Sequence, residues 1–141
     1  MSSEVEISFK NPPVRSSHSK QYWEGLLNDK IVLQKCGDCG AFTHPPGPQC
    51  TSCLSSNRKY FALSGRGSIY TYTVTHRAMH PEFKKDAPYI IVYVRMEEGI
   101  TLASWLTGID PKDVKIGMKV EAVFEKIDER TKLHRFRPAA S

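Results

Sequence analysis

The sequence of 141 residues lacks a long apolar run, and it has no basic run longer than two residues. A membrane-spanning helix needs about 20 mostly apolar residues, so we expect no membrane contact. The opening stretch MSSEVEISFKNPP carries two acidic side chains and lacks the apolar core of a signal peptide. We therefore expect a cytoplasmic protein, whose thiols stay reduced.

The chain also lacks the short motifs of common catalytic sites. It contains no G-x-S-x-G, no H-E-x-x-H, no phosphate-binding loop and no dinucleotide-binding fingerprint. A hydrolase or hydratase that acts alone would need a nucleophile, base or metal constellation, and the sequence shows none. We therefore expect the chain to have no catalytic residues of its own.

Cysteine is scarce, and its placement is informative. All four cysteines lie between positions 36 and 53, as two C-x-x-C pairs separated by ten residues. A thioredoxin-like site uses one such pair in a βαβ setting, whereas the surroundings here suggest strand and turn. Two pairs can form two tight knuckles that hold one tetrahedral Zn²⁺ through sulfurs about 2.3 Å from the ion. The predicted ligands are Cys36, Cys39, Cys50 and Cys53.

Four thiolates also suit iron, so the sequence favours zinc without excluding iron. Four protein ligands leave no open position on the ion, and the metal is therefore expected to be structural. His44 lies between the pairs, and we expect it to be an exposed loop residue. Gly40 follows the first pair but Leu54 follows the second, so we expect the second turn to be made differently. No thiol remains to act as a catalytic nucleophile, which excludes enzymes, such as thiolases, that need a free cysteine.

Apolar spacing divides the chain into three parts. The segment SKQYWEGLLNDK places aromatic and leucine side chains at helical spacing. We therefore expect an N-terminal arm and helix over 1–30, a zinc ribbon over 31–60 bounded by the strands IVLQKC and NRKYFAL, and an all-β domain over 61–141.

Five strands are expected in the last part, in GRGSIYTYTVTH, PYIIVYVRM, ITLASWLTG, KVEAVFEKI and KLHRFRP. The second is apolar on both faces, which predicts a strand covered on both sides. A longer connection precedes the fourth strand, as in a Greek-key barrel of the OB type. The fold class is thus mainly β: an N-terminal helical segment, a ribbon, and a five-stranded OB-fold barrel.

The formal charge of +5 raises the alternative of a nucleic-acid-binding module. Four thiolates and one Zn²⁺ would lower that charge by two, and the basic residues are scattered rather than clustered. Tyr60, Phe61, Tyr70 and Tyr72 could serve as stacking platforms for bases. Tyr70 and Tyr72 alternate in step with Val74, however, so we expect them to build the core, and no nucleic-acid partner is expected.

Several stretches together match one family: YWEGLLNDKIVLQKCGDCG, HPPGPQC, SGRGSIYTYTVTHRAMHPEF, PYIIVYV and FRPA. Over roughly residues 20–140 the chain resembles the acyl-CoA-associated zinc-ribbon OB-fold family, long catalogued as a domain of unknown function. The resemblance implies a helical segment, a rubredoxin-like zinc ribbon with one structural Zn²⁺, and an OB-fold barrel. The chain departs from the family's pattern at Ser104-Trp105 and at His134, and we expect Trp105 to change a contact surface.

The resemblance also implies a partner. Members of this family accompany thiolase-like enzymes and, in some bacteria, MaoC-type enoyl-CoA hydratases. In several systems they form a complex that the thiolase-fold subunit needs for activity, and in the archaeal assembly they help to hold CoA between two active sites. A non-catalytic accessory subunit is therefore implied, with a thiolase, an acyltransferase or a steroid side-chain aldolase as its partner and acyl-CoA at the shared interface.

The loop THRAMHPEFKKDAP carries the most varied chemistry outside the cysteines. Its two histidines are four residues apart, but they follow a strand and precede proline, so a helical metal site is not expected. We expect this loop to contact the partner or a CoA phosphate, with a solvated basic loop as the alternative. The candidate contact residues are Tyr22, Trp23, Arg66, His76, Arg77, His80, Phe83 and Trp105.

Overall fold

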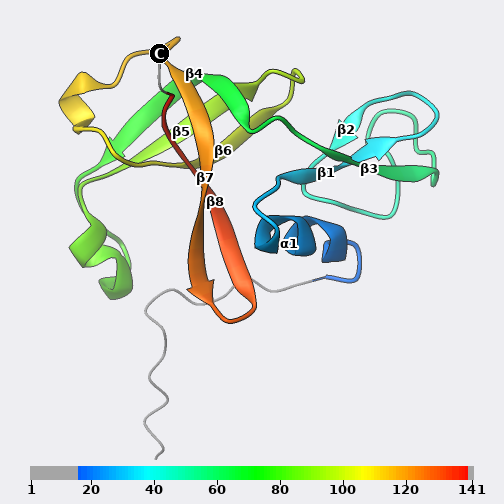
Figure 1. The fold of residues 1–141 in the computed structure, drawn as a ribbon, viewed down its shortest axis with the longest axis horizontal. Coiled ribbons are helices and arrows are strands. Elements are labelled where there is room, and N and C mark those ends of the chain that lie inside the picture. Colours follow the sequence, from blue (N-terminus) through cyan, green and yellow to red (C-terminus); the bar gives the residue numbers. More distant parts are fainter. Residues whose placement is uncertain (1–15, 140–141) are drawn as a thin grey trace, which may run out of the picture.

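The computed structural model describes residues 16–139 (Figure 1). The first 15 residues, where an arm was expected, lie outside the described residues. The elements are α1 (Lys20–Leu27), β1 (Val32–Cys36), β2 (Phe42–Thr43), β3 (Arg58–Ala62), β4 (Arg66–Thr75), the 3₁₀ turn η1 (Pro81–Asp86), β5 (Tyr89–Met96), β6 (Thr101–Leu106), the 3₁₀ turn η2 (Pro111–Asp113), β7 (Lys119–Asp128) and β8 (Thr131–Pro138).

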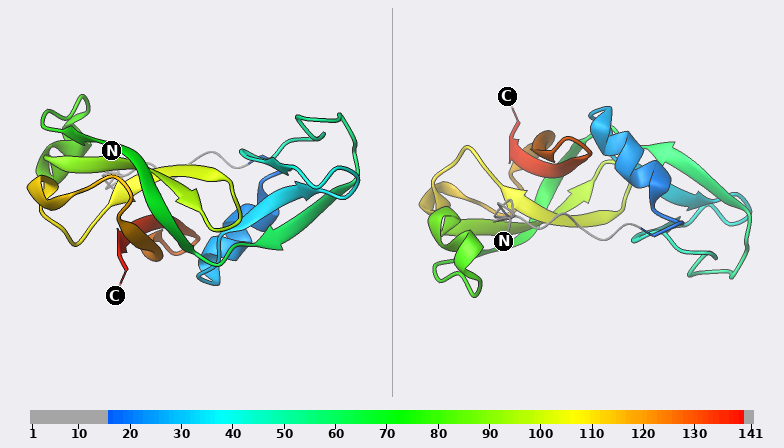
Figure 2. Two further views of the ribbon diagram at one scale, coloured as in Figure 1. Left: turned by 90° about the horizontal axis from the view of Figure 1, so that it is seen from above. Right: turned by 90° about the horizontal axis from the view of Figure 1, so that it is seen from below.

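Two β structures stand side by side and are joined by the short connection from β3 to β4 (Figures 1 and 2). Strands β1, β2 and β3 form a small antiparallel sheet in the order β2-β1-β3, and strands β4 to β8 form a closed barrel in the order β4-β5-β6-β8-β7. The predicted fold class is confirmed: mainly β, with one helix, a cysteine-bearing ribbon and a five-stranded barrel. No helix among the described residues is long and apolar enough to cross a membrane.

The barrel core is built from alternate residues of its strands. Ile90, Val92 and Val94 of β5 point inward and are almost fully buried, as is Phe136 of β8. The two edges of the sheet meet where Leu106 of β6 pairs in parallel with Phe136. Closure of the sheet leaves each strand with one packed face and one outer face.

The prediction that β5 is covered on both faces was therefore wrong. Its inner residues are buried, but Tyr93 on the outer face is 48% exposed, and Tyr89 and Ile91 are only half-buried. Sequence alternation cannot separate these cases, because an apolar outer face looks the same whether the chain's own helix or another protein covers it.

The assignment of Tyr70 to the core was also wrong. The register of β4 against β5 shifts between Ile69 and Thr71, which marks a β-bulge. Ile69 is buried and Tyr72 packs against the core, but Tyr70 is 56% exposed, with the Arg95 guanidinium 4.7 Å from its ring centre. One extra residue in the strand moves Tyr70 to the outer face.

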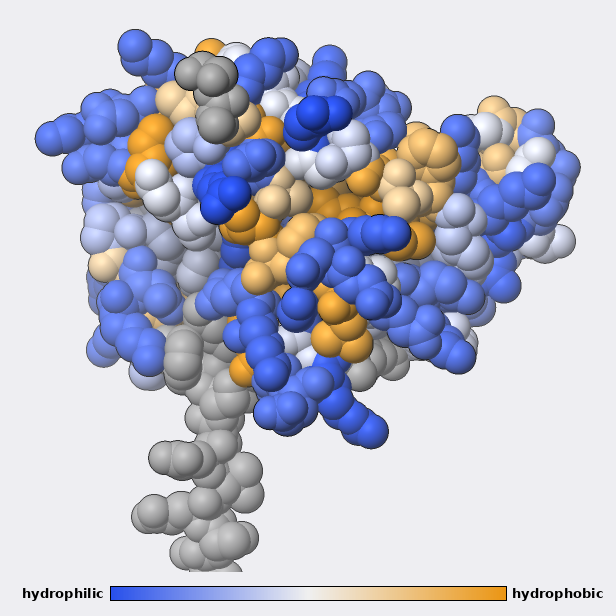
Figure 3. All heavy atoms as spheres, viewed as in Figure 1, coloured by the Kyte–Doolittle hydropathy of each residue, from blue (hydrophilic) through white to orange (hydrophobic). Residues whose placement is uncertain are grey.

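Helix α1 lies in the angle between the ribbon and the barrel, against β1 and β8 (Figure 1). Leu26 is completely buried, while Leu27 beside it remains 40% exposed. In the view of Figure 3, hydrophobic surface gathers near this junction. The helix thus couples the two β structures and leaves an apolar seam between them.

Gly67 of β4 lies against β5 with no room for a side chain, and its replacement tests the packing. A Cβ atom there would lie 2.5 Å from the Arg95 carbonyl oxygen and 2.7 Å from a Val94 methyl group, both held by the sheet. We expect Gly67→Ala to lower the free energy of unfolding by about 1–3 kcal/mol, measured by urea unfolding of the metal-loaded protein. Gly47→Ala is the matched control, because a Cβ at Gly47 meets nothing within 4 Å. Equal stability of the two variants would contradict this packing.

Candidate metal centre and outer barrel surface

The four cysteine sulfurs converge at the far end of the ribbon. Every pair of Sγ atoms lies within 4.8 Å, with Cys36 and Cys53 3.6 Å apart and Cys39 and Cys50 3.5 Å apart. A tetrahedron with metal–sulfur bonds of about 2.3 Å has edges of about 3.8 Å, which is close to the measured separations, so the four sulfurs are placed to hold one ion. The donor set fits a metal that prefers four thiolates, as Zn²⁺ does.

Backbone amides stabilise thiolates at this site. The N–H groups of Cys39 and Asp38 point at the Cys36 sulfur from 3.4 Å and 3.3 Å, and these bonds lower the pKa of that thiol to about 6. At the second knuckle the N–H groups of Cys53 and Ser52 likewise lower the pKa of the Cys50 thiol. The folded backbone therefore favours the charged ligands that a metal ion needs.

The two knuckles turn in the same way, contrary to the sequence expectation. Gly40 has φ 78° and Leu54 has φ 64°, so both adopt the left-handed conformation. For a residue with a Cβ this costs about 1–2 kcal/mol, and metal coordination offsets that cost. The Asp38 carboxylate ties the knuckles together by accepting hydrogen bonds from Ser55 and from the Asn57 amide, and these bonds lower its pKa.

A hydrogen-bonded tyrosine joins the helix, the ribbon and the barrel. The Tyr22 hydroxyl lies 3.0 Å from Nδ1 of His134 on β8, and its ring is 5.1 Å from the ring of His44 in the ribbon loop. His134 is 9% exposed, and its Nε2 has no hydrogen-bond partner within residues 16–139. His44 thus sits beside Tyr22 at this joint and not among the sulfurs.

Burial controls the charge of this joint. Desolvation lowers the pKa of His134 to about 4, with smaller contributions in the same direction from His44 and Arg135 and an opposing one from the Ala103 backbone. Desolvation also lowers the pKa of His44 and raises that of Tyr22 to about 12. All three groups are therefore neutral near pH 7, and a proton on His134 would be an uncompensated buried charge.

Aromatic side chains form a continuous band on the outside of the barrel. The Trp105 ring stacks on Tyr89 with centres 4.5 Å apart and meets the edge of Phe83, which in turn meets His80. On its other side Trp105 lies under the Arg135 guanidinium, 4.5 Å from the ring centre. The band thus runs from the η1 loop to a cavity of about 300 Å³ between α1, β6 and β8, which Tyr22, Ile91, Trp105, Leu133, His134 and Arg135 help to line.

The loop between β4 and β5 forms a second, basic cavity of about 560 Å³. His76, Arg77 and Lys84 line it together, and Met79 beside them is 96% exposed. The loop residues His80 and Phe83 face the aromatic band instead. The predicted contact residues of this loop therefore divide between two adjoining surfaces.

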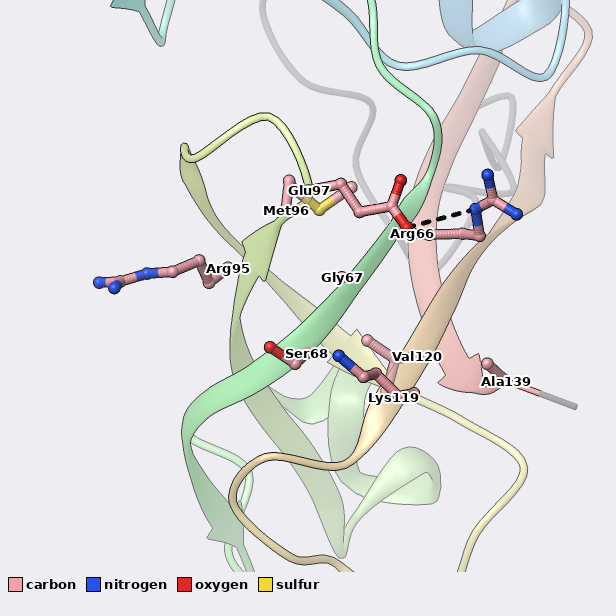
Figure 4. Close-up of a pocket in the computed structure, with 9 residues that line it drawn as sticks. All are labelled: Arg66, Gly67, Ser68, Arg95, Met96, Glu97, Lys119, Val120 and Ala139. Carbon is pink, nitrogen blue, oxygen red and sulfur yellow. Dashed lines mark ion pairs between the residues drawn. The ribbon is translucent and has the colours of Figure 1, made fainter. Parts of the chain in front are cut away.

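Arg66 lies apart from both surfaces, whereas Trp23 lies behind Tyr22 at the end of the aromatic band. Arg66 begins β4 and His76 follows its end, so roughly 30 Å of extended strand separates them. Figure 4 shows Arg66 at a cavity by the start of β4, where its Nε lies 3.6 Å from a Glu97 carboxylate oxygen. Trp23 donates its indole N–H to Ser19, meets the Tyr22 ring edge to face with centres 5.0 Å apart, and lines a separate cavity with Leu27. Arg66 therefore cannot share one small ligand group with Arg77.

His134, Arg135 and Tyr89 were not predicted as contact residues. His134 attracted notice only as a departure from the family pattern, and Arg135 follows it in a strand of mixed polarity. Only the closed barrel places these residues beside Trp105 and Tyr22. A sequence signal existed for Tyr89 alone, because it belongs to the apolar outer face of β5.

These two modules define the class of the protein: a four-cysteine zinc ribbon joined to an OB-fold barrel. A family model described as the rubredoxin-like zinc ribbon domain of ChsH2 matches residues 23–57, and one described as its C-terminal OB-fold domain matches residues 60–125. A DUF35 domain-containing scaffold protein of Methanocaldococcus jannaschii is 36% identical over 119 residues, which cover 74% of this chain and 84% of that protein. The chain belongs to this DUF35 family of zinc-ribbon and OB-fold proteins.

Two further relatives are informative. A probable enoyl-CoA hydratase alpha subunit of Thermomonospora curvata is 36% identical over 118 residues, which are 84% of this chain but only 36% of that subunit. The chain thus spans about a third of that relative's length. Among solved structures, the one named Ltp2-ChsH2(DUF35) aldolase contains a chain that is 33% identical, with a TM-score of 0.82 and coverage of 92% of this chain and 100% of that one.

Removal of one sulfur tests the metal centre. We expect the purified protein to contain one Zn²⁺ per chain by elemental analysis, and Cys39→Ser to lose it because three sulfurs cannot close the tetrahedron. His44→Ala should keep full metal content, since that ring lies at the Tyr22 joint. Stoichiometric iron in place of zinc, or full metal content in Cys39→Ser, would contradict this assignment.

Acid should weaken the Tyr22–His134 joint. Between pH about 6.5 and about 4 the unfolded chain binds a proton that native His134 does not. The free energy of unfolding should therefore fall with decreasing pH, by up to about 1.4 kcal/mol per unit in that window. His134→Asn keeps an acceptor for Tyr22 without this titration, and its unfolding should depend less on pH by that amount. Cysteine protonation affects both proteins alike, so identical pH profiles would argue against a neutral buried His134.

Proposed function

We propose that this chain is a non-catalytic accessory subunit of an acyl-CoA-processing complex. It binds a thiolase-like partner, such as a thiolase, an acyltransferase or an aldolase, and helps to form or cover that partner's CoA or acyl channel. The observation that carries the proposal is the aromatic outer face of the barrel. Strand β5 has the composition of a strand covered on both sides, yet Tyr93 on its outer face is 48% exposed.

The shape and composition of this surface suit a protein interface. Trp105, Tyr89 and Phe83 pack edge to face and face to face, so they form a rigid surface. Interfaces are enriched in aromatic residues and arginine, and the residues that dominate binding are mostly Trp, Tyr and Arg. Arg135 is held over Trp105 and paired with Glu125 at 2.9 Å, so it is already oriented before any partner binds.

The basic cavity adjoins this aromatic band and suits an anionic group. His76, Arg77 and Lys84 converge there and could contact a CoA phosphate held by the partner. Such a group would then lie at the edge of the interface, next to Phe83. In this arrangement the subunit contacts the CoA moiety while the partner supplies the reacting groups.

The relatives support an accessory role over an independent one. Their names describe an alpha subunit of a hydratase, scaffold proteins, and a component of an aldolase. The ribbon contributes rigidity: a Zn²⁺ held by four sulfurs has no open position, so its binding free energy stabilises the fold and supplies no chemistry. A MaoC-type hydratase is a second partner class consistent with the hydratase relative.

One observation favours the alternative of nucleic-acid binding. Tyr70 is exposed beneath Arg95, and an aromatic ring with a nearby arginine is a common stacking platform for single-stranded nucleic acids. We nevertheless favour the protein interface, because the largest aromatic cluster is formed by rings that already stack on one another. A salt titration with single-stranded DNA separates the two: a nucleic-acid binder shows steep salt dependence of its affinity.

The accessory role is tested by removing the aromatic surface. Native mass spectrometry of the tagged chain isolated from its source cells should show a complex with a thiolase-sized subunit of about 40 kDa. We expect Trp105→Ala to weaken that complex by about 2 kcal/mol or more, roughly thirtyfold in Kd, and to lower the partner's activity in parallel.

Ile116→Ala is the matched control, because Ile116 is 68% exposed and lies in the connection between β6 and β7, outside the aromatic band. It should bind the partner normally. A partner that keeps full activity and unchanged substrate scope without this chain would refute the proposed function.

A further inference from the structure

The edge strand β3 of the ribbon sheet is exposed along its length. It lies at the margin of the sheet, and β1 is its only neighbouring strand within residues 16–139 (Figure 2). Tyr60 is 37% exposed and Phe61 is 41% exposed, and the residues on either side of them are exposed as well. Two aromatic side chains therefore stand in solvent at the edge of a small sheet.

The backbone of β3 presents hydrogen-bonding groups at this edge. The Leu63 N–H bonds to the Ile31 carbonyl, and the Asn57 carbonyl accepts from the Gly37 N–H, so the odd-numbered residues of this segment bond to β1. In an antiparallel pair the intervening residues direct both backbone groups away from the neighbouring strand. The residues with outward N–H and C=O groups are Arg58, Tyr60 and Ala62. Such a row of groups is a template for a further strand.

One face beside the edge combines aromatic rings with cations. The strand registers place Lys59 and Phe61 on the same face as Lys35 and Phe42. The rings of Phe42 and Phe61 meet with centres 6.1 Å apart, and the Lys35 ammonium lies 5.3 Å and 5.0 Å from those centres. Aromatic and basic side chains in this combination are more typical of a protein interface than of free surface.

The positive charge on this face is not balanced by an ion pair. The ion pairs of the described part of the chain all involve other residues than Lys35 and Lys59. Lys59 contributes to the lowered pKa of Asp38, but that carboxylate is already engaged by hydrogen bonds from Ser55 and Asn57. An acidic side chain brought to this face would therefore find ammonium groups that it can neutralise.

The same lysines decide which strand fits the edge. Pairing β3 with the β3 strand of a second copy would gather two copies of Lys35 and Lys59 on one face, and like charges disfavour such pairing. A strand with an acidic residue beside Lys59 gains an ion pair instead. Because Phe61 shares the face of Lys59 and follows it by two positions, an apolar residue suits the corresponding place on the incoming strand.

We propose that the open edge of β3 pairs with a strand of the thiolase-like partner that carries an acidic and an apolar residue two positions apart. The acidic residue lies beside Lys59 and the apolar one beside Phe61, while Tyr60 and Ala62 bond to the backbone of that strand. The inference rests on the proposed function, since the partner enzyme supplies the strand. It gives the complex a second point of attachment, on the ribbon, besides the aromatic band of the barrel.

Amide hydrogen exchange tests this pairing with a control inside β3 itself. The zinc-loaded chain is compared, residue by residue, with the complex isolated through the tagged chain. The amides of Tyr60 and Ala62 should exchange rapidly in the free chain and at least roughly tenfold more slowly in the complex. The amides of Lys59 and Phe61 bond to β1, so they should be slow in both samples and report that the ribbon is folded.

Two pairs of variants separate the backbone and charge contributions by titration with the purified partner subunit. Ala62→Pro removes an outward N–H that the ribbon does not use, so it should keep the zinc but raise Kd about tenfold, whereas Ala62→Ser should leave Kd unchanged. Lys59→Glu should also raise Kd about tenfold, and Lys59→Arg should not. Lys115→Glu is the matched charge control, because Lys115 is exposed in the connection between β6 and β7.

The outcomes distinguish this inference from the proposed function. A complex in which Tyr60 and Ala62 exchange as fast as in the free chain overturns the strand pairing and leaves the accessory role intact. Equal Kd values for Ala62→Pro and Ala62→Ser overturn it as well. Protection that appears in the chain alone as its concentration rises would assign the edge to a second copy. Absence of any complex would overturn both the strand pairing and the accessory role.

Discussion

The arrangement of four sulfur atoms around one position is the constraint on which this structure depends. The ribbon has a sheet of only three short strands, and one of them, β2, has two residues. A sheet of this size buries too little apolar surface to fold alone, so the metal must supply the missing stability. The same closure uses every thiol of the chain, and it leaves the ion without an open position. The proposed function therefore depends on the surfaces that the ribbon holds in place and not on chemistry at the metal.

The closed barrel imposes the second constraint, because each strand has one inner and one outer face. Five strands fill the interior with aliphatic side chains and Phe136, and aromatic residues that do not fit inside appear outside. On β5 and β6 these residues are Tyr89, Tyr93 and Trp105. An apolar outer face of this kind lowers solubility unless another surface covers it, which is why the barrel is better explained as one half of an interface than as a complete binding module.

Much of the architecture could be predicted from the sequence, because local patterns determine it. Cysteine spacing defined the ribbon, and period-two alternation gave the barrel strands. The predictions that failed concerned features that depend on the tertiary structure. Leu54 takes a left-handed conformation that its side chain disfavours, because the metal-binding knuckle demands it. A single bulge moved Tyr70 outward, and strand length separated Arg66 from the loop residues with which it had been grouped. None of these outcomes can be predicted from residue type alone.

The residues that depart from the family pattern lie close together in the folded chain. Ser104-Trp105 and His134 are about thirty positions apart in the sequence. In the structure the Ser104 hydroxyl of β6 donates a hydrogen bond to the His134 carbonyl of β8. Trp105 and His134 line the same cavity, together with Arg135 of β8 and Tyr22 of the helix. Only Trp105 lies on the outer face of the barrel, because the buried His134 ring meets the core residue Phe136 edge to face with ring centres 5.8 Å apart. Trp105 therefore changes the shape that the barrel presents to another molecule, whereas His134 changes how the barrel packs against helix α1 through Tyr22.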